Sequence, residues 1–347
     1  MATNRIPITR YASKSFNFGP LAYLEDDWTG DTGFNLMVVP RKAPDGKTSF
    51  LVMVQQLFEI QNFTRVGAPV PNRGGAVGRE QIMGVKYNQT VAENVSKNIL
   101  HEEVGMWLWQ TPTNLNDPSK PLKPGWSTIN NGDYQTPLHP VSRQGVIPHG
   151  NSILLSGDWE SESNVPNFPP VNESYLPVIT TPGIDPAIQK KFQAFYLSQI
   201  ENALSLLPSG ETSGLTVDNF VHPTSLLIPR SSTESSIGTE SLKFFEVINI
   251  HVNSENSKGF GGVDSIPFAH SFALPVDFES YHSIQVVDNT AFSKDPGHDT
   301  ADTQDEVKDY LQLQYFQNIK IQFNIDFEGV NFTVVFPHFE VNTLVKI

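Results

Sequence analysis

A strict alternation of apolar and polar residues near the end of the chain places the strongest constraint on the fold. Apolar side chains occupy every second position from 319 to 327, and polar side chains fill the positions between them. A period of two residues, with one apolar and one polar face, is typical of a β-strand. Glu328 and Gly329 then supply a turn, and residues 331–336 return as a partner strand. The pattern predicts an antiparallel hairpin.

Proline and glycine divide the rest of the chain into short apolar runs. The sequence has 26 Pro and 24 Gly, which is more than a helical bundle tolerates. The stretch from 112 to 148 carries seven prolines and few apolar pairs, and we expect it to be a loop or at most an edge strand. Strands are expected in the apolar runs at 33–39, 50–63, 106–109 and 153–155. These features favour a mainly β fold with long loops.

One segment has the period of a helix instead. Asp185 suits the N-cap, Pro186 suits the first turn, and Pro208 ends the segment. The other side of the helical wheel is polar but poor in cations, so packing over a sheet or barrel is favoured over binding to a membrane surface. The apolar face consists of Ile188, Phe192, Phe195, Tyr196, Ile200, Ala203 and Leu204.

The length of 347 residues is compatible with one large β domain or with two small ones. Hydrophobic residues make up 38% of the chain and 23 residues are Phe, which is enough to fill a core and to line an apolar pocket. The proline-rich residues 164–182 could mark a domain boundary or an insertion. We interpret residues 1–347 as a single large β-barrel domain, with an insertion or a second subdomain at about 160–300 as the alternative.

The charge balance and the lack of cysteine exclude several classes of function. The net charge is −14, which repels nucleic-acid phosphates and anionic lipids alike, so neither nucleic acid nor a membrane is expected as a partner. No apolar stretch approaches the length of a membrane span, and residues 1–10 do not resemble a signal peptide, so we expect a soluble, cytoplasmic protein. The absence of Cys removes disulfides, thiolate nucleophiles and cysteine-ligated metals.

Histidines carry most of the remaining chemistry, because the motifs of the common catalytic classes are missing. His101 leads into an apolar aromatic strand (HEEVGMWLW), as in the wall of a ligand pocket. His149 lies in a turn sequence (IPHGN), and His338 lies in FPHF, directly after the final predicted hairpin. A fourth histidine neighbourhood is that of His270. Each histidine could bind a ligand or could be a structural residue satisfied by a hydrogen bond.

Four segments carry a resemblance to a known family. They are residues 21–30 (LAYLEDDWTG), the H-x-E-x-G strand at 101–105, residues 147–157 and the terminal PHFE at 337–340. Their order resembles that of the nitrobindin family, whose members are calycin-like β-barrels that bind haem. Trp28 and Gly30 match the family's G-x-W-x-G-x-G strand, whereas Asp26 stands where glycine is expected and Gly33 lies one residue too far along.

Further likeness points to one branch of that family. Residues 69–74 (PVPNRG) and 147–150 (IPHG) look more like a longer bacterial and fungal branch that is described as haem-binding. The resembling segments span the whole chain and cover about a third of it. The helix that begins near Asp185 has no counterpart in the smaller nitrobindin barrel.

The resemblance implies an antiparallel calycin-like barrel that holds haem b. Its axial histidine lies near the C-terminus, and His338 is the residue that matches it, as the ligand of the haem iron. His101 would line the barrel through its match to the H-x-E-x-G strand. Trp28, Trp107 and Trp109 are expected near the same pocket.

Three functions remain open from the sequence. A haem-based sensor, carrier or reactive-nitrogen scavenger, which is the interpretation we favour, needs only the bound haem. A haem-dependent peroxidase or isomerase also needs a distal acid–base group, for which His149, or His101 with Arg73, are the candidates. An apo-barrel that binds a lipid or pigment would leave the histidines structural.

Overall fold

Ten long strands form the body of the protein in the computed structural model. The structure describes residues 18–67, 70–71, 81–110, 113–114, 134–135, 139–161, 166–208, 214–227, 243–255, 262–288 and 310–347. The ten strands are β1 (Asp26–Lys42), β2 (Thr48–Arg65), β4 (Gln81–Glu93), β5 (Ile99–Gln110), β8 (Val141–Ile147), β9 (Asn151–Glu160), β11 (Lys243–Asn253), β13 (Leu274–Asp288), β14 (Tyr310–Phe327) and β15 (Val330–Lys346).

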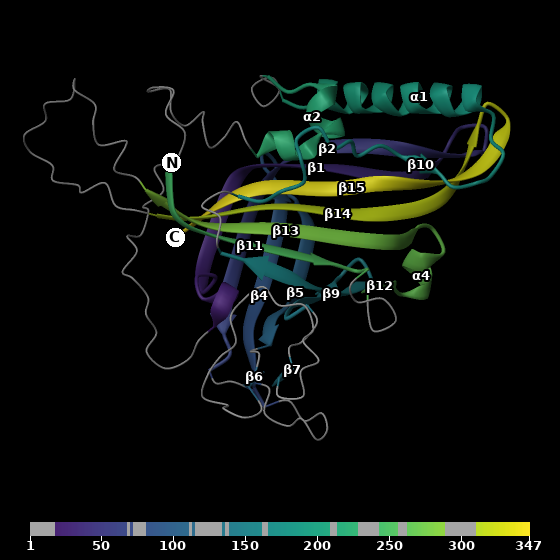
Figure 1. Ribbon diagram of the computed structural model, residues 1–347. Coiled ribbons are helices and arrows are strands. Elements are labelled where there is room, and N and C mark those ends of the chain that lie inside the picture. Colours follow the sequence, from purple (N-terminus) through teal and green to yellow (C-terminus); the bar gives the residue numbers. More distant parts are fainter. Residues whose placement is uncertain are drawn as a thin grey trace, which may run out of the picture.

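These strands close into an antiparallel barrel. Each pairs with the next in chain order, and β15 pairs back with β1, as in the register of Phe34 with Val341. Because β1 and β15 pair with each other, neither of them is an open edge of the sheet. In Figure 1, β4, β5 and β9 cross beneath β13, β14 and β15, so the two sets form opposite walls. The predicted mainly β fold, a barrel with one prominent helix, is confirmed.

Shorter elements accompany the barrel. Strand β10 pairs with β15, and β12 pairs with β9. Figure 1 places β12 and α4 together at one end of the barrel. The short elements are η1 (Gly19–Leu21), β3 (Val70–Pro71), β6 (Thr113–Asn114), β7 (Tyr134–Gln135), β10 (Val178–Ile179), α2 (Val217–Val221), η3 (Pro223–Leu226), β12 (Gly262–Ser265) and α4 (Pro267–His270).

The C-terminal hairpin is present and is longer than the sequence pattern indicates. Glu328 and Gly329 join β14 to β15 with φ angles of 50° and 80°, the positive values that a tight two-residue hairpin turn requires. Strand β15 does not end at residue 336, because it gains a second partner in β1 and continues to Lys346. His338 therefore lies within this strand, opposite Ile319, and not after the hairpin.

The expectation of a loop from 112 to 148 is wrong for its last part. Strand β8 lies between β5 and β9 and pairs with both, so it is not an edge strand. Its residues at 141, 143, 145 and 147 are buried and those between them are mostly exposed. The prolines that suggested a loop flank this strand, and none lies inside it.

Two apolar clusters hold the structure together. The first fills the barrel, since its members come from strands on every side of it, among them Trp28, Trp107 and Leu313. The second lies between helix α1 (Pro186–Ser205) and the sheet of β1, β2, β14 and β15. Figure 1 shows α1 lying along the outside of this sheet. Phe192 is only 2% exposed there, so the helix packs over the barrel as predicted.

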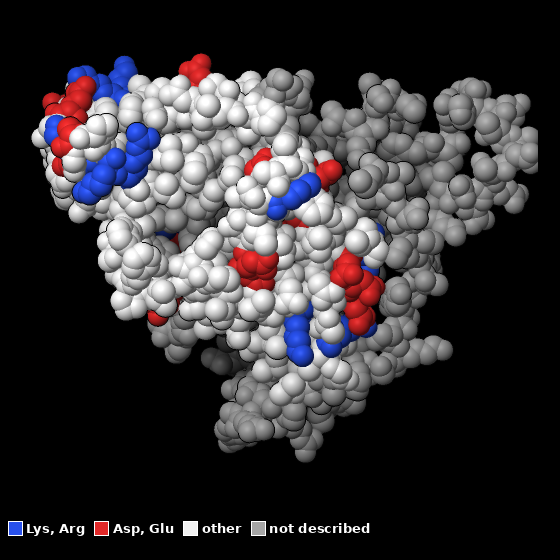
Figure 2. All heavy atoms as spheres, turned by 180° about the vertical axis from the view of Figure 1, so that it is seen from behind, with Lys and Arg blue, Asp and Glu red and all other residues white. Residues whose placement is uncertain are grey.

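The ends of α1 also follow the sequence signals. The Asp185 side chain accepts a hydrogen bond from the backbone N–H of Ala187 at 2.8 Å, and Pro186 occupies the first turn. None of the described helices is long and apolar enough to cross a membrane. On the face seen in Figure 2, acidic and basic side chains are interspersed over the described surface.

Candidate functional site

A cavity of about 380 Å³ in the barrel brings together three of the four singled-out histidines, and His270 is not among its lining residues. His101 comes from β5, His149 from the turn between β8 and β9, and His338 from β15. The wall between them is mostly apolar, with Ile319 and Phe339 among its members. The remaining lining residues are Asn35, Met37, Val39, Val91, Leu100, Glu103, Ile147, Asn151, Ala269, Ala273, Pro275, Phe278, Gln317, Ile321 and Glu340.

His338 has an unusual environment for an imidazole. Its Nδ1 atom is buried and has no hydrogen-bond partner among the described residues. Burial, together with the positive charge that His101 and His149 can carry, lowers the pKa of His338 to about 4. The ring is therefore neutral at physiological pH, which is the state that can offer a nitrogen lone pair to a metal or accept a hydrogen bond from a ligand.

His101 and His149 lie next to each other, with ring centroids 5.7 Å apart. Burial lowers the pKa of His101, but the hydrogen bond and charge of Glu103, whose Oε2 lies 3.4 Å from His101 Nε2, outweigh it and raise the pKa overall. Burial and the charge of His101 lower the pKa of His149. Within the part of the chain that is described, no three His, Asp or Glu side chains converge as a metal site.

A buried ion pair supports this wall. Arg143 on β8 is 2% exposed, and its Nη2 lies 2.9 Å from Glu103 Oε1. The same guanidinium donates to Gln317 Oε1 at 2.9 Å and to the Tyr87 hydroxyl at 3.2 Å. Burial opposes the charge on Glu103, but Arg143 and His101 hold the pKa of Glu103 at about 2. Glu103 is therefore ionised and fully paired.

A second carboxylate lies deeper in the barrel wall. Glu59 on β2 is 0% exposed, and burial together with the neighbouring Glu340 raises the pKa of Glu59 to about 7. The Tyr315 hydroxyl lies 2.6 Å from Glu59 Oε2 and also contacts Glu340 Oε1. Since Glu340 lines the cavity, this chain of contacts runs from the cavity into the core.

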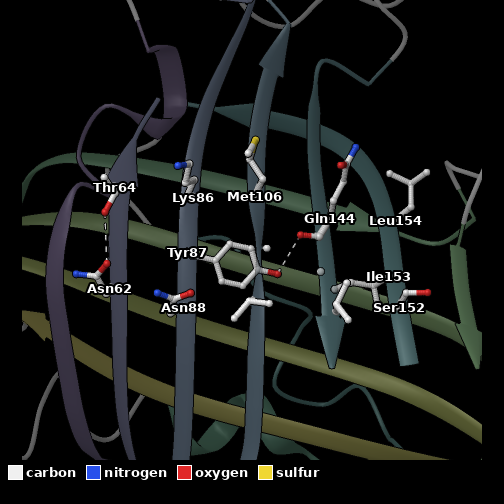
Figure 3. Close-up of a pocket in the computed structure, with 14 residues that line it drawn as sticks. Asn62, Thr64, Lys86, Tyr87, Asn88, Met106, Gln144, Ser152, Ile153 and Leu154 are labelled. Carbon is white, nitrogen blue, oxygen red and sulfur yellow. Dashed lines mark hydrogen bonds between the residues drawn. The ribbon is translucent and has the colours of Figure 1, made fainter. Parts of the chain in front are cut away.

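A hollow of about 820 Å³ lies on the other side of the same wall (Figure 3). It is shallow, since the side chains of Lys86, Asn88 and Val104 around it are exposed. Tyr87 reaches from the interior toward Gln144 in this view.

A pair of glycines makes this approach of Tyr87 possible. Gly105 and Gly145 face each other on β5 and β8, and a Cβ on either one would lie within 2.7 Å of the Tyr87 hydroxyl. The two glycines thus leave room for Tyr87 to reach Glu103 and Arg143. The exposed hollow is a weaker candidate for a ligand site than the cavity, in which the Nδ1 atom of His338 is buried without a partner.

Other residues singled out from the sequence lie elsewhere. Trp28, Trp107 and Trp109 belong to the apolar cluster inside the barrel and are not among the residues that line the cavity. The Trp28 Nε1 donates to the Leu24 carbonyl at 2.8 Å, which satisfies its polar atom. Arg73 lies outside the described residues.

The sequence reasoning missed the buried polar residues of the site, although a signal for them exists. Glu59 lies on the same face of its strand as the buried Leu57, Gln61 and Phe63, so its side chain points into the barrel. Arg143 lies in the same way between the buried Val141 and Gly145. A charged residue in the inward phase of a strand indicates a paired group inside the barrel.

The fold and the cavity together define a closed β-barrel of the kind that binds a ligand in its interior. No protein-family model matches the chain, and no curated protein matches it. A search of solved structures finds the crystal structure of Rv2717c from M. tuberculosis, with 9% sequence identity and a TM-score of 0.34 over 94% of this chain and 97% of that one. This likeness is too distant to assign the chain to a family.

Proposed function

We propose that the barrel binds a small, largely apolar ligand in the cavity, and that this ligand is haem b with His338 as its axial ligand. One observation carries the proposal: a neutral histidine with a buried, unpartnered ring nitrogen lines an internal cavity whose wall is mostly apolar. A single histidine is a common protein ligand of haem iron.

The residues around the cavity fit a porphyrin better than a bare metal ion. No three acidic or histidine side chains of the described chain converge, so a metal bound here would have to bring most of its own ligands, as haem iron does. Ile319, Ile321 and Phe339 offer apolar contact to a flat ring. When bound, haem would bind diatomic gases at its iron and would transfer electrons. His338 would hold it, and His101 and His149 would line the same chamber.

A metal-free apolar ligand is the second candidate. The cavity volume of about 380 Å³ is at the lower end of the range of about 300–1,000 Å³ for small-molecule sites, which favours a compact occupant. His338 would then accept a hydrogen bond from the polar end of that ligand.

Titration with haemin tests the proposal. The full chain should bind one haem with a Soret band that His338→Ala abolishes or shifts, because that variant removes the only proposed bond from protein to iron. Imidazole added to His338→Gly should restore the band, because it can occupy the space left by the side chain. His270→Ala is the matched control, since His270 is exposed on α4 and should not affect the band.

Two results would count against haem. If His338→Ala binds haem with the stoichiometry and spectrum of the parent, the axial assignment is wrong. If the parent gives no Soret band but binds a compact apolar molecule such as toluene, the metal-free barrel is the correct function.

A further inference from the structure

The segment that joins β12 to β13 forms a neutral tip on an acidic protein. Residues 265–276 (SIPFAHSFALPV) contain no Asp, Glu, Lys or Arg, in a chain whose net charge is −14. Helix α4 lies within this segment, at one end of the barrel (Figure 1). Of the two flanking acidic residues, Asp264 is exposed, and Asp277 is paired with Lys320 Nζ at 2.7 Å.

Large apolar side chains are exposed on the outer side of this tip. Phe268 is 72% exposed and Phe272 is 59% exposed, and their rings lie against each other with centroids 5.1 Å apart. Ile266 and Val276 of the same segment are exposed as well. Single exposed apolar residues are ordinary on a protein surface, whereas a group of them indicates a binding surface.

The backbone of the segment directs the two rings outward. Its helical turn continues beyond α4, since the Ala273 N–H donates to the Ala269 carbonyl at 3.2 Å. Ala269 and Ala273 face the cavity, whereas Phe268 and Phe272, one position earlier, are exposed. The small side chains therefore pack on the barrel and the large ones do not, which is the reverse of an ordinary packing helix.

The tip is attached to the turn that carries His149. The Ile266 N–H donates to the Gly150 carbonyl at 2.8 Å, and a Cβ on Gly150 would lie 2.5 Å from the Ile266 side chain. Pro275, further along the segment, also lines the cavity. The exposed rings and the wall of the ligand cavity are thus two sides of one short segment.

The size and charge of this surface favour a lipid surface over a protein partner. Its four exposed apolar side chains are far fewer than the roughly 20–30 residues per side of a stable protein interface. Docking in the headgroup region of a bilayer depends on the apolar area that is buried and needs no matching surface. The net charge of −14, which led us to expect no membrane partner, repels anionic headgroups but not zwitterionic ones.

We propose that residues 265–276 dock the barrel on a zwitterionic lipid surface, with Phe268 and Phe272 in the interface, and that the cavity takes up its apolar ligand from that surface. The uptake rests on the proposed ligand-binding function, whereas the docking does not. The docking is reversible, because two rings bury little area, and anionic lipid added to the surface weakens it.

Phe268→Trp reports the docking on the full chain without added ligand. Its emission should shift to the blue and should be quenched by phosphatidylcholine vesicles with brominated acyl chains, because the indole ring enters the interface. Leu206→Trp is the matched control, since Leu206 is also highly exposed but lies at the end of α1. It should give no quenching above that of the parent.

Substitution of the two rings tests their role. Phe268→Ala should weaken binding to phosphatidylcholine vesicles about tenfold, and Phe268→Glu combined with Phe272→Glu should reduce co-sedimentation to background. Leu206→Glu should keep the binding of the parent. Because all three positions are exposed, the charged variants should unfold in urea at the midpoint of the parent.

Haemin carried in phosphatidylcholine vesicles tests the uptake. If the protein collects haemin at the lipid surface, the transfer rate should rise in proportion to the vesicle concentration. The rate should fall at least tenfold in the doubly charged variant. That variant should still bind haemin added from water, because its cavity is unchanged.

The possible failures are distinguishable. No quenching of Phe268→Trp, or equal quenching of Leu206→Trp, would overturn the docking and leave the ligand-binding barrel intact. A lipid-free dimer that depends on Phe268 and Phe272 would overturn it as well, since the surface would then join two copies of this chain. Docking without transfer, in a protein that binds haemin from water, would contradict the uptake. Docking without any binding of haemin would contradict the proposed function alone.

Discussion

The Arg143–Glu103 pair shows what the interior of this barrel demands of single residues. Both side chains are almost fully buried. Transfer of each charge from water to the protein interior costs roughly several kcal/mol, which a charged partner and further hydrogen bonds must offset. Arg143 meets this demand with Glu103, Tyr87, Gln317 and Ser280. Such a pair fixes how β5 and β8 lie relative to β13 and β14 around the cavity.

Asp26 illustrates a residue whose backbone departs from the ordinary. The φ angle of Asp26 is 95°, in the region that favours glycine, although the residue is an aspartate. A register shift in β1 follows between Gly30 and Gly33. Both irregularities thus lie in the first part of one strand.

The buried carboxyl group of Glu59 should make stability depend on pH. Below about pH 4.5 the Glu59 carboxyl group holds a proton in both the folded and the unfolded chain, and between about 4.5 and 7 only the folded chain keeps it. The free energy of unfolding should therefore fall as pH rises through this window, by up to about 3 kcal/mol, relative to Glu59→Gln. Urea unfolding of both proteins over a pH series measures the difference.

Other titratable groups do not affect the difference in pH dependence between the two proteins. His338, whose pKa is lowered to about 4, gives a slope of opposite sign between about pH 4 and 6.5, but it is present in both proteins and cancels. Glu328→Gln should track the parent. Curves for Glu59→Gln and the parent that run parallel through the window would show that the pKa of Glu59 is not raised in the folded chain.

At the scale of elements, local sequence patterns predicted the helices and turns that depend only on residues nearby in the chain. The helix from Pro186 and the hairpin at Glu328–Gly329 follow from capping, turn chemistry and periodicity, and both are present. Strand β8 was missed because nearby prolines outweighed a short alternation that includes a charged residue. The end of β15 was set too early, since its continuation depends on pairing with β1, at the other end of the chain.

The packing of α1 gives a prediction at this scale. Phe192 lies against Phe50, Phe332 and Phe336, with ring centroids 5.7, 5.5 and 6.1 Å away. Phe192→Ala should lower the free energy of unfolding by about 3–5 kcal/mol, because it leaves a cavity between helix and sheet.

Leu206→Ala is the matched control for this helix, because Leu206 is 84% exposed, and it should change the free energy of unfolding by no more than about 0.5 kcal/mol. Denaturant midpoints compare the two variants. Equal effects would mean that the apolar face of α1 is not held on the barrel.

At the scale of the whole molecule, closure of the barrel creates the site. His101, His149 and His338 are far apart in the sequence, and each alone could be a structural residue. Only the pairing of strands from both ends of the chain brings them to one cavity. Sequence motifs selected these histidines. The sequence did not predict the buried carboxyl groups of Glu59 and Glu103. A buried glutamate can be recognised only when it is known which face of its strand points into the barrel.

The central claim is that a ligand occupies this cavity and is held by His338. Anomalous diffraction at the iron edge, from crystals of the full chain loaded with haemin, locates the metal directly. The account predicts one strong peak inside the barrel, next to the His338 ring and in the chamber shared with His101 and His149. An iron peak on the outer hollow beside Lys86 and Val104, or no ordered peak in the barrel at full haem occupancy, would contradict it.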